Sequence, residues 1–273
     1  MPMPEEQCTL KAGASLAGRG LHTGEPCRIT LLPAGPDTGV VFRAPDGEIP
    51  ALAANVIGTK RGTSLGKDGA EVHTVEHLLA ALAGLGIDNA VIEVEGGEVP
   101  AADGSALPFV ELIESAGIQR QNAEAKVIRL SVPIWTDDVG RWAVALPSEV
   151  LRISAFIAFA NRMIGEQIHG FRADPDTFKR EIAPARTFCT ADEIDALRAQ
   201  GLGKGGEENN VIVVYEDKYS IPLRFRDEFV RHKLLDLIGD LSLVGGRLHA
   251  DVVTIKTSHA LNVALASKIA NTG

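Results

Sequence analysis

Hydrophobic and polar positions alternate through the first forty-odd residues. The alternation runs through TLKAGASL, CRITLLP and GVVFRA, and the intervening GRGLHTGEP and AGPDTG are rich in Gly, Pro and Asp. A period of two is typical of strands with one buried face, whereas Gly, Pro and Asp favour turns. The pattern therefore predicts that the chain begins with a series of β-strands joined by turns.

The pattern then changes to helical spacing. We expect a helix over about 75–83, with Thr74 as a plausible N-cap and Gly84 as a stop. A strand is expected at AVIEVEG, followed by a second helix at PFVELIESAG, in which Pro108 lies near the first position and Gly117 just past the end.

The second half repeats this mixture of strands and helices. Strands are predicted at KVIRLSVPIW, RWAVALP, LRISAFIAFA, NVIVVYED and ADVVTIKT. Helices are predicted in a segment opening at Asp174-Pro175, at ADEIDALRAQG, over about 227–243, and in a last segment capped by Ser258. Strands and helices do not alternate regularly, which favours an α+β fold over a doubly wound sheet.

A polar, aperiodic connection, RQNAEAK at 120–126, marks the predicted domain boundary. A chain of 273 residues is long enough for two domains. We therefore expect an N-terminal α+β domain over 1–122 and a C-terminal α+β domain over 123–273.

The helix DEFVRHKLLDLIGDLSLV carries a column of polar residues on a largely apolar surface. His232, Asp236 and Asp240 recur at i, i+4 and i+8, so they share one face. Because isolated buried charge is unfavourable, such a column must be internally paired or bind a metal. The alternative, a solvated helix edge with an ordinary i,i+4 pair, is equally compatible with the spacing.

The apolar helix HTVEHLLAALAGLG has a Glu–His pair in its first turn. Glu76 and His77 are the only ionisable residues between Thr74 and Gly86, so they lie at the edge of a packed interior. Their side chains point about 100° apart, so His77 can bind a metal while Glu76 reaches a water molecule beside it. The alternative is an N-terminal Glu favoured by the helix dipole next to a structural His.

Together the two helices offer His77, His232 and Asp236 as metal ligands. Three protein ligands leave a tetrahedral zinc ion one open position, which is the arrangement of catalytic zinc sites. Ferrous iron also accepts two His and one carboxylate. Water on zinc becomes acidic enough to attack a carbonyl near neutral pH, with a carboxylate as general base.

Three further residues carry weaker signals. His259 follows the last helix cap and can donate a proton only if a carboxylate such as Asp240 offsets the helix dipole; a structural role is the alternative. Thr187 and Phe188 in ARTFC offer a hydroxyl donor and an aromatic surface, and alone they indicate little.

Composition restricts the partners. A net charge of -9 argues against extensive nucleic-acid binding. No apolar run approaches the length of a membrane span, and the first residues lack the features of a secretory signal. Three Cys without CxxC spacing suggest a reducing compartment. We therefore expect a cytoplasmic protein with no nucleic-acid partner, no stable membrane insertion and no obligate protein partner.

The chain resembles the UDP-3-O-acyl-N-acetylglucosamine deacetylases, zinc enzymes that commit Gram-negative bacteria to the synthesis of lipid A in lipopolysaccharide. The resemblance lies in GRGLHTG, HTVEHLLAALAGLGIDN, ADGSALPFVE, ARTFCTADEI, GLGKGG, RFRDEFVRHKLLDLIGDL and SHALN, which follow the family order over nearly the whole chain. It implies two similar α+β domains that form a layered sandwich with helices between two sheets, and an active site at the domain interface. It implies hydrolysis of the N-acetyl group of UDP-3-O-(3-hydroxyacyl)-N-acetylglucosamine, with release of acetate.

The resemblance also implies residue roles. His77, His232 and Asp236 would bind zinc and Glu76 would be the general base. His259, tuned by Asp240, would be the general acid. The remaining implied roles are those of Thr187 as oxyanion donor, Lys233 as a contact to the diphosphate or other polar substrate groups, and Phe188 as a surface near the uracil.

A family insert corresponds to residues 191–215 and would form an apolar passage for the 3-O-acyl chain. The implied lining residues are Ile194, Leu197, Val211 and Val213. Gly205 and Gly206 would allow a close approach that a larger residue would block.

Two other functions share parts of this pattern. A non-catalytic nucleotide-sugar binding homologue would tolerate loss of Glu76, His259 or Thr187, and all three are present. A zinc deacetylase of another acylated amino sugar would keep the metal residues and differ in the insert.

Overall fold

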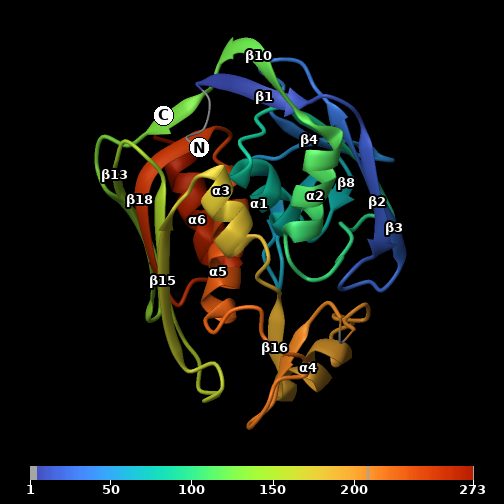
Figure 1. The fold of residues 1–273 in the computed structure, drawn as a ribbon, viewed down its shortest axis with the longest axis vertical. Helices are drawn as coiled ribbons and strands as arrows, with labels where there is room; N and C mark the ends of the chain where they lie inside the picture. Colours follow the sequence, from blue (N-terminus) through green and yellow to red (C-terminus); the bar gives the residue numbers. More distant parts are fainter. Residues whose placement is uncertain (1–4, 208, 273) are drawn as a thin grey trace.

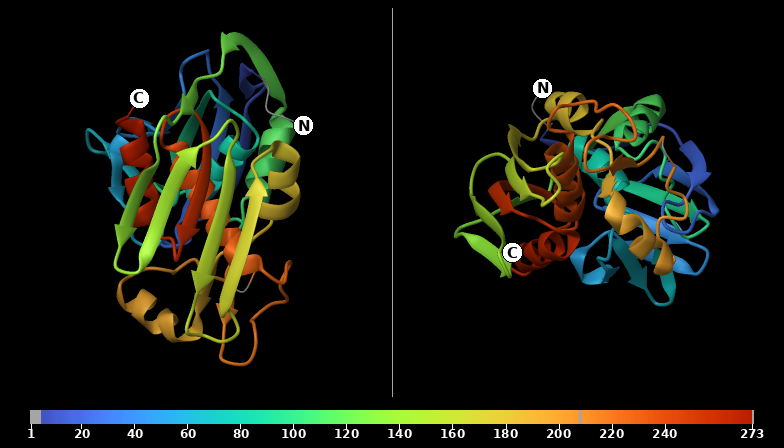
Figure 2. Two further views of the ribbon diagram at one scale, coloured as in Figure 1. Left: turned by 90° about the vertical axis from the view of Figure 1, so that its left-hand side faces the viewer. Right: turned by 90° about the horizontal axis from the view of Figure 1, so that it is seen from below.

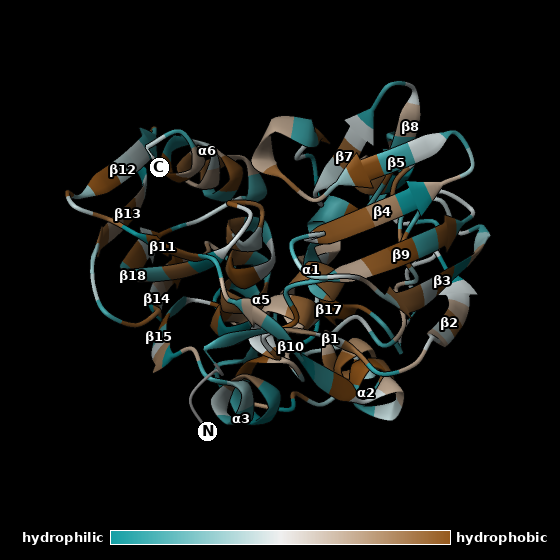
Figure 3. Ribbon diagram, turned by 90° about the horizontal axis from the view of Figure 1, so that it is seen from above, coloured by the Kyte–Doolittle hydropathy of each residue, from teal (hydrophilic) through white to brown (hydrophobic). Residues whose placement is uncertain are grey.

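The computed structural model describes residues 5–207 and 209–272, and two β-sheets enclose a layer of helices (Figures 1 and 3). The first sheet contains β2 (Ala14–Arg19), β3 (Pro26–Pro33), β9 (Ala90–Glu95), β4 (Val40–Ala44) and β5 (Gly47–Pro50). The second contains β12 (Ile134–Asp138), β13 (Arg141–Pro147), β18 (Arg247–Ile255), β14 (Arg152–Ala158) and β15 (Glu166–Arg172), and β11 (Val127–Arg129) pairs with β18.

The two sheets have the same topology. In each, the third strand in spatial order is the last in sequence; it is antiparallel to one neighbour and parallel to the other. Thus β9 is antiparallel to β3 and parallel to β4, and β18 is antiparallel to β13 and parallel to β14. The sequence predicts the α+β class, and the structure confirms it with two sheets of matching strand order on either side of the helices.

The inward faces of the sheets are apolar because the strands alternate. In β3 and β14 every second residue is buried, as expected for strands with one face against the core. Figure 3 shows the sheets on opposite sides of α1 and α5 when the molecule is viewed from above.

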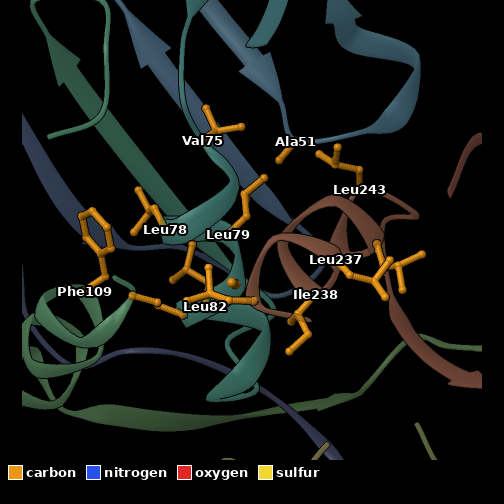
Figure 4. Close-up of a cluster of buried hydrophobic side chains, with 14 of the residues drawn as sticks. Ala51, Val75, Leu78, Leu79, Leu82, Phe109, Leu237, Ile238 and Leu243 are labelled. Atoms are coloured by element: carbon orange, nitrogen blue, oxygen red, sulfur yellow. The ribbon is translucent and has the colours of Figure 1, made fainter. Parts of the chain in front are cut away.

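The central helices are α1 (Glu76–Gly84) and α5 (Glu228–Ser242), which pack against each other. Leu79 and Leu82 of α1 lie on the side of Leu237 and Ile238 of α5 in the buried cluster of Figure 4, whereas Leu78 lies next to Phe109. The other helical segments are α2 (Leu107–Ala116), α3 (Pro175–Thr177), α4 (Ile194–Ala199), α6 (His259–Ala270), a π-helical turn (Phe178–Ile182) and two 3₁₀ turns (Ala53–Asn55, Ala191–Glu193). The α1 and α5 helices occupy equivalent places, since each directly precedes the last strand of its sheet.

The start of α1 differs from the prediction that Thr74 caps it. Val75 occupies the N-cap position, and Thr74 has a φ of 58°. The hydroxyl of Thr74 instead donates a 2.9 Å hydrogen bond to Oε1 of buried Glu98. Long-range pairing with a carboxylate therefore replaces the local capping that the sequence suggested.

Three small sheets complete the molecule. They are β6 (Val56–Gly58) with β7 (Ser64–Lys67) and β8 (Ala70–Val72); β1 (Glu6–Leu10) with β10 (Ile118–Glu124); and β16 (Phe188–Thr190) with β17 (Ile212–Val214). The predicted connection at 120–126 mostly belongs to β10, whose pairing with distant β1 the local sequence does not reveal. In the described residues, no helix is both long and apolar enough to span a membrane.

The segment that contains β16, α4 and β17 projects away from the two large sheets and contacts the turn between β2 and β3. The pair β16–β17 and helix α4 project below the two sheets in Figure 1 and in the left view of Figure 2. The Gly205 amide donates to the Leu21 carbonyl at 3.0 Å, and a Cβ on Gly205 would lie 2.1 Å from the Gly20 carbonyl oxygen. A larger residue at Gly205 would clash with this turn, and a Cβ on Gly206 would lie 3.2 Å from the Gly203 carbonyl oxygen.

The crossing of α1 and α5 depends on Gly239. A Cβ on Gly239 would lie 2.1 Å from the carbonyl oxygen of Glu76, which is backbone and cannot rotate away. The glycine lets α5 approach the first turn of α1, the turn that contains Glu76 and His77.

Replacing Gly239 with Ala is expected to lower the free energy of unfolding by about 2–4 kcal/mol, because the added methyl overpacks a rigid contact. Chemical denaturation measures the change. The matched control is Gly35→Ala, where the nearest atom to the new Cβ is 3.8 Å away. Equal stability of the two variants would show that the helices can separate without loss.

Candidate metal centre

His77, His232 and Asp236 lie together where α1 and α5 pack against each other. One ligand atom from each lies within 4.8 Å of the others, and all three side chains are buried. The Nε2 atoms of His77 and His232 are 3.5 and 3.4 Å from Asp236 Oδ1, and the two imidazole rings meet edge-on at 5.0 Å. Helix α1 supplies one ligand and α5 the other two, so the close helix crossing sets the geometry.

The tautomer of His232 is fixed by a backbone group. Its Nδ1 lies 3.1 Å from the Ala185 carbonyl oxygen, which can only accept, so Nδ1 carries the proton and the Nε2 lone pair faces Asp236. Burial lowers the pKa of His232 to about 3. A neutral ring with a free Nε2 lone pair is the form that binds metals.

The carbonyl of Ala185 is held in turn by a buried ion pair. Arg186 Nε donates to Glu228 Oε1 at 2.8 Å, and the Arg186 backbone amide donates to the same oxygen at 3.1 Å. Glu228 is the first residue of α5, so the pair anchors the segment before Phe188 to the helix that contains His232.

A metal ion fits these residues for a specific reason. The Asp236 Oδ1 atom is buried and has no hydrogen-bond partner among the described residues, although its other oxygen accepts from Lys233 Nζ at 2.9 Å. Buried carboxylate oxygens are normally satisfied, and an orphaned one that faces two imidazole nitrogens fits the coordination of a cation. Within residues 5–207 and 209–272, this is the one group of three or more His, Cys, Asp or Glu found with such spacing.

Glu76 lies beside these residues. Its Oε2 accepts a 2.9 Å hydrogen bond from the Thr63 amide, and the residue is 3% exposed. Burial raises the pKa of Glu76 above its usual value. A carboxylate whose pKa is shifted towards neutrality is suited to accept and release a proton.

His259 faces the same site from the start of α6. Its Nδ1 lies 2.9 Å from Asp240 Oδ2, and its Nε2 lies 3.9 Å from Asp236 Oδ2. Burial alone would lower the pKa of His259, but Asp240 and Asp236 raise it to about 9. The contact with Asp240 favours the protonated imidazole and provides the neighbouring carboxylate that a proton-donating role for His259 would require.

Phe188 and Lys233 form the wall of the site on the side of the insert. The Phe188 ring contacts Phe229 at 4.7 Å and His232 at 6.1 Å between centroids, and Lys233 Nζ is 5.6 Å from its centre. The backbone of Thr187, one residue before, is held by Gly104 and Ile212.

The predicted lining residues of the acyl passage lie in the insert. Ile194 and Leu197 are on α4, Val213 is on β17 and Val211 directly precedes it. All four are half-buried, so they present apolar surface on a small unit that has no large core.

The sequence reasoning missed several residues that organise the site. Asn262 donates to Asp240 Oδ2 at 2.9 Å, Thr63 donates to Asp240 Oδ1 at 2.6 Å, and Ala185 orients His232. None has a charge or a spacing that points to the site. The family-like blocks SHALN and ARTFC contain two of them, and that was the only available signal.

Three clustered ligands flanked by a buried carboxylate and by an imidazole–carboxylate pair are typical of metal-dependent hydrolases. The chain belongs to one family of that class, the UDP-3-O-acyl N-acetylglycosamine deacetylases, whose family model matches residues 7–271. Its members are hydrolases that act on an amide.

Individual relatives agree over most of their length. The chain is 48% identical over 267 residues to a UDP-3-O-acyl-N-acetylglucosamine deacetylase of Saccharophagus degradans, covering 94% of this chain and 88% of that protein. It is 43% identical over 269 residues to the enzyme of that name from Syntrophotalea carbinolica, covering 96% and 87%. For the Myxococcus xanthus enzyme of that name the identity is 44% over 274 residues, covering 98% and 87%. The family assignment suggested by the sequence blocks is confirmed.

Proposed function

We propose that the chain hydrolyses the 2-acetamido group of UDP-3-O-(3-hydroxyacyl)-N-acetylglucosamine, the committed step of lipid A biosynthesis, with a zinc ion held by His77, His232 and Asp236. The observation that carries the proposal is the meeting of these three residues with Glu76 and His259 at one buried place in a chain of the deacetylase family. The products are UDP-3-O-(3-hydroxyacyl)-glucosamine and acetate.

The groups of the chain divide the proton transfers between them. When bound, zinc acts as a Lewis acid that polarises the amide carbonyl and makes water more acidic. Glu76 takes a proton from the attacking water, and the C–N bond breaks as His259 gives its proton to the departing nitrogen. Thr187 donates a hydrogen bond to the carbonyl oxygen while that oxygen carries negative charge.

The substrate is held on either side of the reacting amide. Lys233, partly exposed beside Asp236, meets the diphosphate or other polar groups, and Phe188 offers its ring to the uracil. Ile194, Leu197, Val211 and Val213 line the passage for the acyl chain. The reaction takes place in the cytoplasm, where a reducing environment suits the free thiols of Cys8, Cys27 and Cys189.

Acetate release from acyl-chain variants of the UDP-sugar, before and after chelation, tests the proposal. Removing the metal is expected to lower turnover by at least about 100-fold, and zinc is expected to restore it. Adding ferrous iron instead of zinc to the chelated protein shows which of the two metals supports the faster turnover. Equal turnover of an acylated N-acetylglucosamine without uridine diphosphate would replace the proposed substrate with another acylated amino sugar.

A further inference from the structure

Thr63 contacts the proposed general base through its backbone. The residue directly precedes β7 and is fully buried. Its amide donates to Glu76 Oε2 at 2.9 Å, and its carbonyl accepts from the Val75 amide at 3.1 Å. These two bonds fasten Thr63 to the first turn of α1 and leave one carboxylate oxygen of Glu76 for the reaction.

The side chain of Thr63 contacts the other side of the proton-transfer system. Its hydroxyl donates to Asp240 Oδ1 at 2.6 Å and lies 3.5 Å from His259 Nδ1. Asp240 is fully buried, and its second oxygen accepts from His259 Nδ1 and from Asn262 Nδ2, each at 2.9 Å. The carboxylate plane of Asp240 is thus fixed by a donor on each oxygen.

The orientation of Asp240 determines that of His259. The imidazole must present Nε2 to the reacting amide while Nδ1 remains bound to Asp240 Oδ2. Without the Thr63 hydroxyl, Asp240 Oδ1 is buried and loses this hydrogen-bond donor. The carboxylate of Asp240 can then rotate until Oδ1 finds another donor. Rotation moves Oδ2 and therefore the ring.

We infer that Thr63 is a positioning residue for the reaction. Its amide fixes the carboxylate of Glu76, and its hydroxyl, through Asp240, fixes the orientation of the His259 ring relative to Glu76. Among the described residues it is the one that hydrogen-bonds to both carboxylates. This inference rests on the proposed roles of Glu76 and His259. Thr63 contacts Glu76 Oε2, Asp240 and the Nδ1 side of His259, so it acts on the proton-transferring groups and not directly on the substrate.

Two substitutions separate the hydroxyl from the shape of the side chain. Thr63→Val keeps the branched shape and the amide bond to Glu76 but removes the hydroxyl, whereas Thr63→Ser keeps the hydroxyl. We expect T63V to lower kcat on the order of tenfold with KM and zinc content near wild type, and T63S to recover most of that loss.

The matched control is Thr9→Val, because Thr9 is also buried and its hydroxyl also makes two hydrogen bonds, in this case to Asn89 and Ala34 away from the site. T9V is expected to lower stability while kcat per folded chain stays near wild type.

A double-mutant cycle with His259→Gln distinguishes positioning from general structural support. If the hydroxyl acts through His259, T63V costs less than about twofold once His259 is gone. An equal cost in both backgrounds, or a T63S variant as slow as T63V, would overturn the inference.

Nuclear magnetic resonance of ¹⁵N-histidine-labelled zinc-loaded protein provides a readout without turnover. The Nδ1 proton of His259, identified by its loss in His259→Gln, is expected to shift in T63V and to keep its position in T63S. An unchanged signal in T63V contradicts the inference even if the substrate differs from the proposed one. A wild-type protein that releases no acetate contradicts the proposed function, and this spectrum then decides the role of Thr63 independently.

Discussion

Replacing Glu76 with Gln is expected to lower kcat by about 10²- to 10⁴-fold, the usual contribution of a positioned general base. The change is nearly isosteric, and the amide oxygen can still accept the Thr63 N–H bond that Glu76 Oε2 accepts now. The side chain then fits the same space but can no longer take a proton from water. Zinc content is expected to stay near one ion per chain, because Glu76 is not one of the three ligands.

Single-turnover kinetics and metal analysis of the same preparation check this result. The matched control is Glu98→Gln, because Glu98 is also buried but serves the fold: its oxygens accept from the backbone and side chain of Thr23, the His22 amide and the Thr74 hydroxyl. That variant is expected to unfold more easily while its kcat per folded chain stays within about threefold of wild type. An E76Q variant with wild-type kcat would mean that another group accepts the proton.

The shared buried face of His232 and Asp236 on α5 could be predicted because helical periodicity is a local property. His232 and Asp236 lie one turn apart on a helix whose apolar positions already indicate burial, so the sequence contained both the spacing and the reason for it. His77 could be proposed in the same way from the apolar run that follows it. That the two helices cross at Gly239 is a tertiary fact, and it is what brings these two half-sites together.

Residues that act through long-range contacts could not be found in this way. Thr63 lies in the turn between β6 and β7, and its hydroxyl contacts Asp240 across 177 positions of sequence. Thr74 has the composition of a helix cap, yet a buried carboxylate 24 residues away takes its hydroxyl. Local propensity is a weak guide wherever a buried charge competes for the same donor.

The matching topology of the two sheets was also beyond local sequence reasoning. Strand order depends on which segments pair, and the pairing of β9 with β4 or of β18 with β14 leaves no signature in either strand alone. Because α1 and α5 hold equivalent places in the two halves, the metal-binding residues come from corresponding helices. The proposed roles nevertheless differ between the helices, since α1 contains His77 and Glu76 whereas α5 contains His232, Asp236 and Asp240.

Replacing Asp236 with Asn is expected to remove the metal itself, in contrast to the change at Glu76. The Asn side-chain amide is a poor ligand for zinc. It also lacks the negative charge that Asp236 presents at Oδ1, the orphaned oxygen that faces both imidazole rings. We expect the affinity for zinc to fall by at least about 100-fold, more than the loss typical of residues outside the ligand set, and turnover to fall with it. Metal analysis after dialysis against a weak chelator measures the first effect, and acetate release measures the second.

The matched control is Asp251→Asn on the outward face of β18, which should keep its zinc. Because Asp236 also accepts from partly exposed Lys233, the variant weakens the contact that positions this ammonium, so added zinc should restore only part of the activity. Full recovery on adding zinc would show that the two histidines suffice, and would reduce Asp236 to a group that orients Lys233.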